Sequence, residues 1–377
     1  MKRYKIGILG CGKVAHLHAK AILEIPDAEF VAVWSRSKET AENFAAQYGV
    51  KNYRSISEMI TENQIDLVIV CTPHPFHKEP TIEAAKAGAN VLVEKPLAST
   101  LGDCDEMIAA CRENKVKLGV ISQRRWYAPV KRVKQAIDDG KIGIQALGTI
   151  TMLGWRDKAY YDSDAWRGTW QMEGGGVLVN QAPHQLDILL WMMGDIDEVY
   201  GIHKNLNHPY IEVEDTALAI VKFKNGGIGN ILVSNSQKPG IHGKVHIHGE
   251  NGASVGVQTD GGAMFIAGRS GVLEPPVNDL WTVPGEEHLL RQWQQEDSEF
   301  FQKIDATVFY MKEQIKDFLQ ALKENRDPLV TGEQGRKTVE LFTAIYRSSR
   351  NGRPIRFPLP TNDLQHDMDG RINPTNL

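Results

Sequence analysis

The chain has 377 residues, a formal net charge of −4 at pH 7, 42% hydrophobic residues and 24% charged residues. This length is enough for two domains with cores of their own, and the composition is that of an ordinary globular protein. The slight negative charge gives no reason to expect a nucleic acid or an anionic membrane surface as a partner.

The four cysteines, Cys11, Cys71, Cys104 and Cys111, do not have the spacing of a metal site or of a disulfide framework. No run of the sequence approaches the roughly 20 apolar residues that a membrane span needs. We therefore expect a cytoplasmic protein with no structural metal and no membrane partner.

The N-terminal segment has the pattern of a dinucleotide-binding fold. A strand is expected over Tyr4–Leu9, followed by Gly10-Cys11-Gly12-Lys13-Val14-Ala15 and a helical pattern through Leu23. Gly10 permits the tight turn, Gly12 lets backbone N–H groups approach a pyrophosphate, and Ala15 lets the helix pack closely on the strand. The motif alone also fits a glycine turn between any strand and helix, so the inference of a dinucleotide site depends on the strand and helix on either side and on the segments that follow. We place Gly10, Gly12, Lys13 and Val14 in the cofactor site.

The second expected strand, Phe30–Trp34, ends at Ser35 and Arg36, about 20 positions after the glycine motif. An acidic residue here would hold the ribose 2′-hydroxyl of NAD, and this chain has none. Arg36 could instead pair with the 2′-phosphate of NADP, or it could stack on adenine or face solvent. The sequence therefore indicates NAD(P) as the cofactor and favours NADP.

Strands and helices continue to alternate up to about residue 122. Further strands are expected near 50–53, 66–71, 91–93 and 118–121, with helices near 39–48, 81–87 and 104–113. This alternation predicts a doubly wound parallel sheet, a Rossmann domain over residues 1–122.

Two strand ends in this domain carry polar residues. Ligands gather outside the carboxyl ends of the strands in such sheets. Thr72 and Pro73 follow one strand, and His77 after them is compatible with capping the next helix or with a place beside the nicotinamide. Glu94 and Lys95 follow the 91–93 strand, where a charged pair is either a surface ion pair or part of the chemistry.

The second half has a different pattern. A helix is expected over 123–138, strands near 149–153, 199–202, 216–223, 228–234 and 244–249, and helices near 310–325 and 332–350. Successive strands with short turns predict a mostly antiparallel sheet, so we expect residues 123–360 to form an α+β domain that binds the substrate. Residues 361–377 are expected to form a polar tail.

The segment from Trp166 to Asp187 concentrates candidate binding residues. Gly174-Gly175-Gly176 allows close approach of backbone and ligand, and a helix is expected from about Gln181 to Met193. His184 and Asp187 are three residues apart and can share a face of that helix. Asn180 is placed either to cap the helix or to point into the site.

These motifs together resemble the Gfo/Idh/MocA oxidoreductases, the family of glucose–fructose oxidoreductase and inositol dehydrogenase. The resemblance runs from about Tyr4 to Pro358. It implies a Rossmann domain, a second domain whose open sheet forms homodimers or homotetramers, and NAD(P)-dependent chemistry at a carbinol carbon of a sugar, inositol or polyol. It also implies that Lys95 and His184 are the catalytic residues.

One position departs from the family pattern, because Asn180 stands where many members carry Asp. An amide can hydrogen-bond a substrate hydroxyl but cannot take a proton. With the resemblance in hand, the expected substrate-binding residues are Arg125, Tyr160, Asn180 and Asp187. The expected cofactor-binding residues, beyond the glycine motif, are Ser35, Arg36, Thr72, Pro73, His77, Glu94, Lys95, Trp166 and Arg167.

The groups suggest how such a reaction would proceed. An imidazole has an ordinary pKa of about 6.5 and is suited to proton transfer, so His184 would exchange the proton of the substrate hydroxyl. The Lys95 ammonium would polarise the oxygen and stabilise a developing alkoxide. We expect a sugar or cyclitol dehydrogenase, or the reverse ketone reductase.

Two other functions remain open at this point. A nucleotide-sugar oxidase would need a diphosphate site, for which Arg124, Arg125, Lys131 and Arg132 could supply charge, although on a helix they fit a solvated face equally well. A sugar- or cofactor-sensing regulator on the same fold would be expected to lose Lys95 and His184, and this chain has both.

Overall fold

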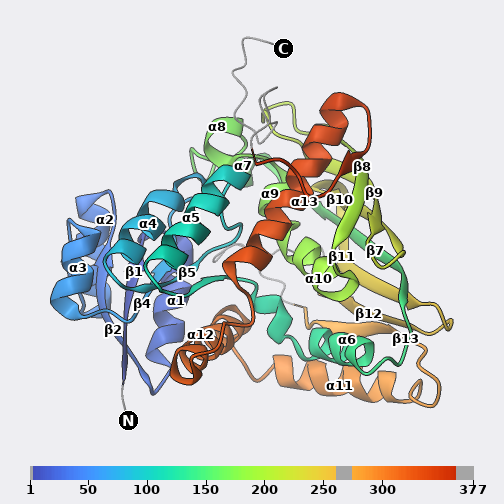
Figure 1. Ribbon diagram of the computed structural model, residues 1–377, viewed down its shortest axis with the longest axis horizontal. Coiled ribbons are helices and arrows are strands. Elements are labelled where there is room, and N and C mark those ends of the chain that lie inside the picture. Colours follow the sequence, from blue (N-terminus) through green and yellow to red (C-terminus); the bar gives the residue numbers. More distant parts are fainter. Residues whose placement is uncertain (1–2, 260–273, 362–377) are drawn as a thin grey trace. The chain divides into compact units, whose positions relative to one another are not determined.

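The computed structural model describes residues 3–259 and 274–361, and the chain divides into two compact units whose elements are labelled in Figure 1. The first unit comprises Met1–Gln123 and Asp305–Val339, and the second comprises Arg124–Ile304 and Glu340–Leu377. The expected polar tail falls outside the described residues except for Thr361. Within the described ranges, no helix is both long and apolar enough to cross a membrane.

The first unit contains a parallel sheet of six strands in the order β3-β2-β1-β4-β5-β6, which confirms the predicted Rossmann domain. The central strands are short apolar runs buried on both faces, as helices on both sides require. The strands are β1 (Tyr4–Leu9), β2 (Ala28–Trp34), β3 (Lys51–Tyr53), β4 (Leu67–Val70), β5 (Asn90–Val93) and β6 (Leu118–Val120).

The helices of this sheet begin where capping residues stand. Ser37, Ser55 and Thr100 each accept a hydrogen bond from a backbone N–H three residues later. The helix α3 was missed by the sequence analysis because its eight residues offer only three buried apolar positions. The helices are α1 (Lys13–Leu23), α2 (Lys38–Tyr48), α3 (Ile56–Asn63), η1 (His74–Phe76), α4 (Lys78–Lys86) and α5 (Leu101–Glu113).

The C-terminal segment 305–339 groups with the first unit, which differs from the predicted second domain of 123–360. The reason is the helix α12 (Ala306–Glu324), which packs against α1. Its buried Met311, Ile315 and Phe318 join Ala19 and Ile22 of α1 in the hydrophobic core of this unit. Burial of these apolar side chains stabilises the packing of α12 on α1, although the two helices are far apart in the sequence.

The second unit contains a mixed sheet of eight strands in the order β13-β12-β11-β7-β10-β9-β8-β14. All its strand pairs are antiparallel except β7 with β10, which run parallel. The strands are β7 (Gln145–Trp155), β8 (Ile196–Lys204), β9 (Thr216–Phe223), β10 (Ile228–Ser234), β11 (Ser236–Gly249), β12 (Ser254–Gln258), β13 (Val277–Trp281) and β14 (Ile355–Arg356).

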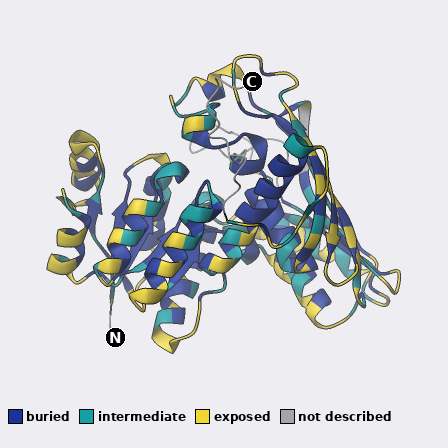
Figure 2. Cartoon of the chain, turned by 45° about the horizontal axis from the view of Figure 1, so that its top comes forward, coloured by how far each residue is buried: buried dark blue, intermediate teal, exposed yellow. Residues whose placement is uncertain are grey.

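One face of this sheet is covered by helices and the other is open. Alternate residues of β9 are buried and exposed, and helix α10 packs on β7 and β11. The open face carries exposed apolar side chains on β8, β9 and β10, namely Tyr200, Ile202, Leu218, Ile220 and Ile228. In Figure 2 the outer surfaces of helices and this sheet show many exposed residues around dark, buried strands.

The remaining helices of the described residues lie within 123–301 and 332–351. They are η2 (Gln123–Trp126), α6 (Ala128–Asp138), α7 (Lys158–Tyr161), α8 (Trp170–Glu173), α9 (Val177–Asn180), α10 (Pro183–Met193), α11 (Leu289–Phe301) and α13 (Gly332–Asn351). The sequence analysis missed α11, β12 and β13. The peptide bonds before Pro96 and Pro358 are cis.

Candidate active site

The glycine motif forms a cradle between β1 and α1. Gly10 has φ +97°, and a Cβ there would lie 2.7 Å from the backbone nitrogen of Thr72, so only glycine fits. A Cβ on Gly12 would meet no atom within 4 Å, and no side chain caps the helix that begins at Lys13. The open approach to the N-terminus of α1 suits a dinucleotide pyrophosphate.

Arg36 follows the end of β2 and lies against the loop after β4. Its Cζ atom is 4.5 Å from the centroid of the Phe76 ring, and its side chain is exposed. Stacking on the ring orients the guanidinium while leaving its edges able to donate hydrogen bonds. Ser35 precedes it at the same strand end and is half-buried.

The loop after β4 is held by His77, whose ring is buried. Its Nε2 lies 2.8 Å from the Thr72 carbonyl oxygen, and its Nδ1 lies 3.1 Å from the carbonyl oxygens of Pro96 and Leu97. Burial lowers the pKa of His77 in spite of these hydrogen bonds. The side chain therefore links the loop that carries Thr72 and Pro73 to the loop that carries Lys95.

Lys95 is the second residue after β5, at the same edge of the sheet as the glycine cradle. The Glu94 carboxylate accepts hydrogen bonds from the Lys95 backbone nitrogen at 3.1 Å and from His18 Nε2 at 2.8 Å. Burial raises the pKa of Glu94, but His18 and Lys95 outweigh it, so that the pKa is lowered overall. His18 lies on α1, so this hydrogen bond connects the cofactor helix to the backbone of Lys95.

In the second unit, the glycine triplet lies against a buried glutamate. A Cβ on Gly176 would lie 1.8 Å from the Glu214 carbonyl oxygen, so this position needs glycine. The Glu214 carboxylate accepts hydrogen bonds from the backbone nitrogens of Gly176 and Leu178, at 2.8 and 3.0 Å, and from the Tyr346 hydroxyl at 2.9 Å. Glu214 thus fixes the entry into α9.

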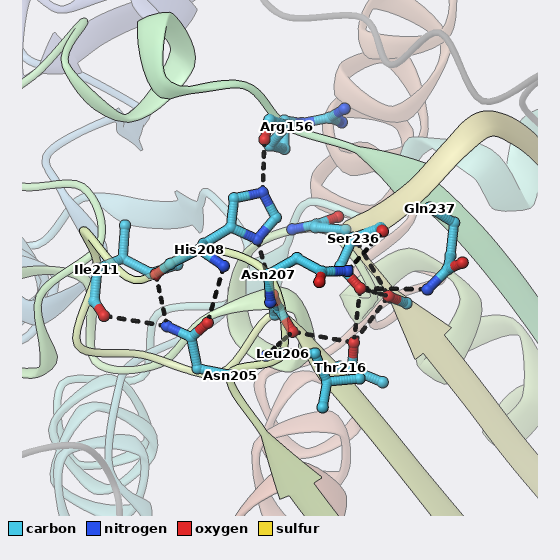
Figure 3. A network of polar contacts seen from close by, with 12 residues as sticks. Arg156, Asn205, Leu206, Asn207, His208, Ile211, Thr216, Ser236 and Gln237 are labelled. Carbon is cyan, nitrogen blue, oxygen red and sulfur yellow. Dashed lines mark hydrogen bonds and ion pairs between the residues drawn. The ribbon is translucent and has the colours of Figure 1, made fainter.

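The segment before Glu214 is fixed in turn by a buried polar network, drawn in Figure 3. His208 Nδ1 lies 2.7 Å from a carboxylate oxygen of Asp215, and its Nε2 lies 2.7 Å from the Arg156 carbonyl oxygen. The Asp215 carboxylate also accepts from the backbone nitrogens of Leu206 and Asn207. This network holds the 205–215 loop.

His184 lies in the first turn of α10, directly after Pro183, and is 7% exposed. The helix starts at Pro183, two residues later than the sequence indicated. Asn180 does not cap it, because Asn180 ends the preceding short helix α9. Its Nδ2 atom donates to the Tyr160 hydroxyl oxygen at 3.1 Å.

Arg125 and Asp187 form a buried ion pair with each other. Arg125 Nε and Nη2 donate to the two carboxylate oxygens of Asp187 at 2.8 and 2.6 Å, and Arg125 is 2% exposed. The Arg125 guanidinium also lies over the Trp191 ring, with 4.8 Å between Cζ and the ring centroid. This pair anchors α10 to η2, and a role in substrate binding stays a prediction for both residues.

Trp166 and Arg167 lie beside Tyr160 in the second unit. The Arg167 guanidinium lies 4.4 Å from the Trp166 ring centroid and 4.3 Å from that of Tyr160. It donates to the Asp164 carboxylate at 3.2 Å and to the Tyr160 hydroxyl oxygen. These contacts show Arg167 supporting Tyr160, whereas its expected contact with the cofactor stays a prediction.

Four buried polar residues of these sites were missed by the sequence analysis: His18, Glu173, Gln181 and Glu214. Two of them stand next to motifs that were recognised. His18 lies three positions after Ala15, and Glu173 directly precedes the glycine triplet. Glu214 had no such signal, because its partner Gly176 is 38 residues away.

Comparison with known proteins gives matches over most of the chain. Residues 4–122 match the model of the GFO_IDH_MocA oxidoreductase family, described as an NAD-binding Rossmann fold, and residues 130–255 match the GFO/IDH/MocA C-terminal domain.

Two relatives and one solved structure illustrate the likeness. The myo-inositol 2-dehydrogenase of Thermotoga maritima is 27% identical over 93% of this chain and 98% of its own length. The 1,5-anhydro-D-fructose reductase of Ensifer adhaerens is 27% identical over 92% of this chain and 96% of its own length. The WlbA dehydrogenase from Bordetella pertussis, solved in complex with NADH and UDP-GlcNAcA, has a TM-score of 0.83 and 30% identity, covering 95% of this chain and 99% of that one.

Glu214 is expected to make the stability of the chain depend on pH. Burial raises the pKa of its carboxyl to about 7, in spite of the hydrogen bonds from Leu178, Gly176 and Tyr346. A raised pKa in the folded state means that the contribution to stability is full below the ordinary value of about 4.5 and is lost as the pH rises through about 7.

We expect the free energy of unfolding of a Glu214→Gln variant to fall less than that of the wild type between about pH 5 and about pH 8, by about 2–3 kcal/mol. Denaturant titrations at several pH values measure this difference. Glu212→Gln, at an exposed neighbouring position, is the control and should keep the wild-type pH dependence. Parallel pH curves for the wild type and Glu214→Gln would contradict the assignment.

Proposed function

Because the chain belongs to the GFO/IDH/MocA oxidoreductase family, we propose that it transfers a hydride between NAD(P) and a carbinol or ketone carbon of a sugar, a sugar derivative or an inositol. Curated relatives that align over nearly the whole chain include an inositol dehydrogenase and a sugar reductase, which supports this substrate class. A single observation carries the proposal. Lys95 follows β5 at the edge of the parallel sheet where the glycine cradle also lies.

The residues of the first unit suit a bound dinucleotide. The cradle between β1 and α1 would take the pyrophosphate, because Gly12 leaves room and the helix N-terminus offers backbone N–H groups. Thr72, Pro73 and the Glu94 loop lie at the carboxyl ends of the neighbouring strands. When bound, the nicotinamide supplies the hydride acceptor or donor.

In our proposal Lys95 and His184 act on one substrate oxygen. The Lys95 ammonium, whose backbone is held by Glu94, polarises this oxygen and stabilises negative charge on it. The His184 imidazole takes the hydroxyl proton during oxidation and returns it during reduction. Asn180 does not move a proton, because an amide is not a base at neutral pH.

A nucleotide sugar is the second candidate substrate, and one observation favours it. The 30% identical WlbA dehydrogenase was solved with UDP-GlcNAcA. Two of the four basic residues expected to supply a diphosphate site are held elsewhere: Arg125 pairs with Asp187, and Arg132 donates to both oxygens of the Asp297 carboxylate at 2.6 and 2.8 Å. Of these four, Arg124 and Lys131 are the ones that could still contribute to a diphosphate site.

We propose that the chain prefers NADP over NAD. Arg36 follows β2, where NAD-specific relatives of this fold carry an acidic residue, and Phe76 orients its guanidinium. Lys38, on the adjacent helix, is an exposed basic residue that contacts Glu42, so its replacement is a matched control for a replacement of Arg36.

The open face of the second sheet is proposed to bind a second copy of the chain, giving a homodimer or a homotetramer. Paired residues across β8 and β9, Tyr200 with Ile220 and Ile202 with Leu218, make a continuous exposed apolar surface. Surfaces of this kind in stable proteins usually mark an interface.

A cofactor-linked assay should detect turnover of a sugar, an inositol or a nucleotide sugar, and Lys95→Met should abolish most of it. The screen uses myo-inositol, 1,5-anhydro-D-fructose and UDP-GlcNAcA with oxidised or reduced NAD and NADP.

We expect Lys95→Met to lower kcat by about 10²- to 10³-fold, because one electrostatic contact to the reacting oxygen is lost. Cofactor affinity, measured by fluorescence, should stay close to that of the wild type. Lys86→Met, on the exposed surface of α4, is the control. Full turnover by Lys95→Met would refute the assignment.

Arg36→Ala should change the choice of cofactor. We expect the ratio of kcat/KM for NADP to that for NAD to fall by about tenfold, the loss of one charge-assisted hydrogen bond to the 2′-phosphate. Lys38→Ala should leave the ratio unchanged. A wild-type enzyme that prefers NAD, or an unchanged ratio in Arg36→Ala, would show that Arg36 does not bind the phosphate.

Ile220→Lys should separate the copies, because it places a charge in the centre of the open face. Light scattering after gel filtration should give the mass of a dimer or a tetramer for the wild type and a smaller mass for the variant. Leu23→Lys replaces an equally exposed apolar residue outside this face and should not change the mass. A monomeric wild type would rule out this interface.

A further inference from the structure

Glu173, the last residue of α8, carries a buried carboxylate that has no part in the proposed chemistry. It is 1% exposed and directly precedes the glycine triplet. One carboxylate oxygen accepts from the Gly168 backbone nitrogen at 2.5 Å, and the other accepts from Asn180 Nδ2. A buried carboxylate without such donors would be strongly unfavourable, so these contacts are essential to the local fold.

Glu173 determines which way the Asn180 amide faces. A carboxylate only accepts hydrogen bonds, so Asn180 must turn its NH2 group toward Glu173 and not its oxygen. The same Nδ2 atom lies 3.1 Å from the Tyr160 hydroxyl oxygen. One hydrogen of the amide therefore goes to Glu173 and the other to Tyr160.

Two further donors converge on the Tyr160 oxygen. Gln181 Nε2 lies 2.9 Å from it, and the Gln181 amide is oriented by Asn235, which donates to Gln181 Oε1 at 2.9 Å. Arg167 Nη1 is the third donor. Each of these groups donates, so none of them accepts the hydrogen of Tyr160.

The Tyr160 hydroxyl keeps that hydrogen at neutral pH. Burial, and then the charge of Glu173, raise the pKa of Tyr160 to about 12, although Arg167 and Arg156 act in the opposite direction. Tyr160 is therefore a neutral phenol whose oxygen receives hydrogen bonds and whose O–H can itself donate one.

We propose that Glu173 is a positioning residue for substrate recognition: through Asn180 it holds Tyr160 so that the Tyr160 hydroxyl donates to an oxygen of the substrate. The inference rests on the proposed function and deepens it, because it assigns to the sugar or polyol an acceptor oxygen opposite Tyr160. Asn180 acts as the connector and the carboxylate acts as the anchor.

The first test measures, without any substrate, whether Glu173 affects the pKa of the Tyr160 hydroxyl. The chain contains 10 tyrosines, and labelling them all with 3-fluorotyrosine gives fluorine resonances, of which the one lost in Tyr160→Phe belongs to Tyr160. Glu173→Gln should lower the pKa of this tyrosine, because a negative charge beside the phenol is removed. Asp162→Asn, which removes an exposed carboxylate paired with Lys158, should leave it unchanged. An unchanged pKa in Glu173→Gln would overturn the proposal.

The second test is a double-mutant cycle with the substrate found in the screen. Glu173→Gln and Tyr160→Phe should each lower kcat/KM by about tenfold, mainly through KM, as expected for one lost hydrogen bond to the substrate. The double variant should be no worse than Tyr160→Phe, because Glu173 acts through Tyr160. Additive losses, or a lower melting temperature with an unchanged KM, would overturn the proposal.

If Glu173→Gln does not fold, a further variant tests the same connection. Asn180→Ala removes the connector, leaves the carboxylate in place, and must give the same non-additive result with Tyr160→Phe. The two proposals also fail separately. A chain that turns over no sugar refutes the proposed function, whereas the fluorine titration still decides whether Glu173 controls Tyr160.

Discussion

The candidate sites depend on one kind of interaction, a buried carboxylate that accepts hydrogen bonds from the backbone of a loop. Glu94 accepts from the backbone nitrogen of Lys95, Glu173 from that of Gly168, and Glu214 from those of Gly176 and Leu178. An isolated buried charge is very unfavourable, so each carboxylate enforces the one loop conformation that satisfies it. These hydrogen bonds stabilise the conformation of the loops next to the candidate catalytic residues.

This arrangement separates the groups that hold the site from the groups that we propose react in it. Glu94 accepts hydrogen bonds from His18 on α1 and from the backbone nitrogen of Lys95, and it therefore links α1 to the loop that carries Lys95. His77 joins the loops after β4 and β5 through three backbone carbonyl oxygens. Within each unit the groups that fix the loops are thus different from the residue that we propose to be catalytic, and catalysis by preorganised charges requires such support.

Local signals in the sequence were sufficient for most of the fold. Gly10, Gly12 and Ala15 predicted the first turn, and the bounds expected for β1, β9 and β10 are those of the structure. The helix α3 was missed for lack of apolar positions, and α12 was assigned to the wrong unit because its partners on α1 lie almost 300 residues earlier. Glu214 was missed because its partner Gly176 is 38 residues away. Glu94 was predicted to lie in the cofactor site, but nothing local indicates its hydrogen bond with His18, 76 residues earlier.

Asn180 shows how a departure from a family pattern becomes intelligible once its surroundings are known. The sequence alone placed an amide where a carboxylate was expected and suggested a weakened proton relay. The structure places both the Glu173 carboxylate and the Tyr160 hydroxyl within hydrogen-bond distance of the Nδ2 atom of that amide. An amide between a carboxylate and a phenol transmits orientation but not protons, since it donates to both and accepts from neither. A negative charge is therefore kept near the candidate site without a basic oxygen at position 180, and in our proposal this leaves His184 to handle the proton of the substrate.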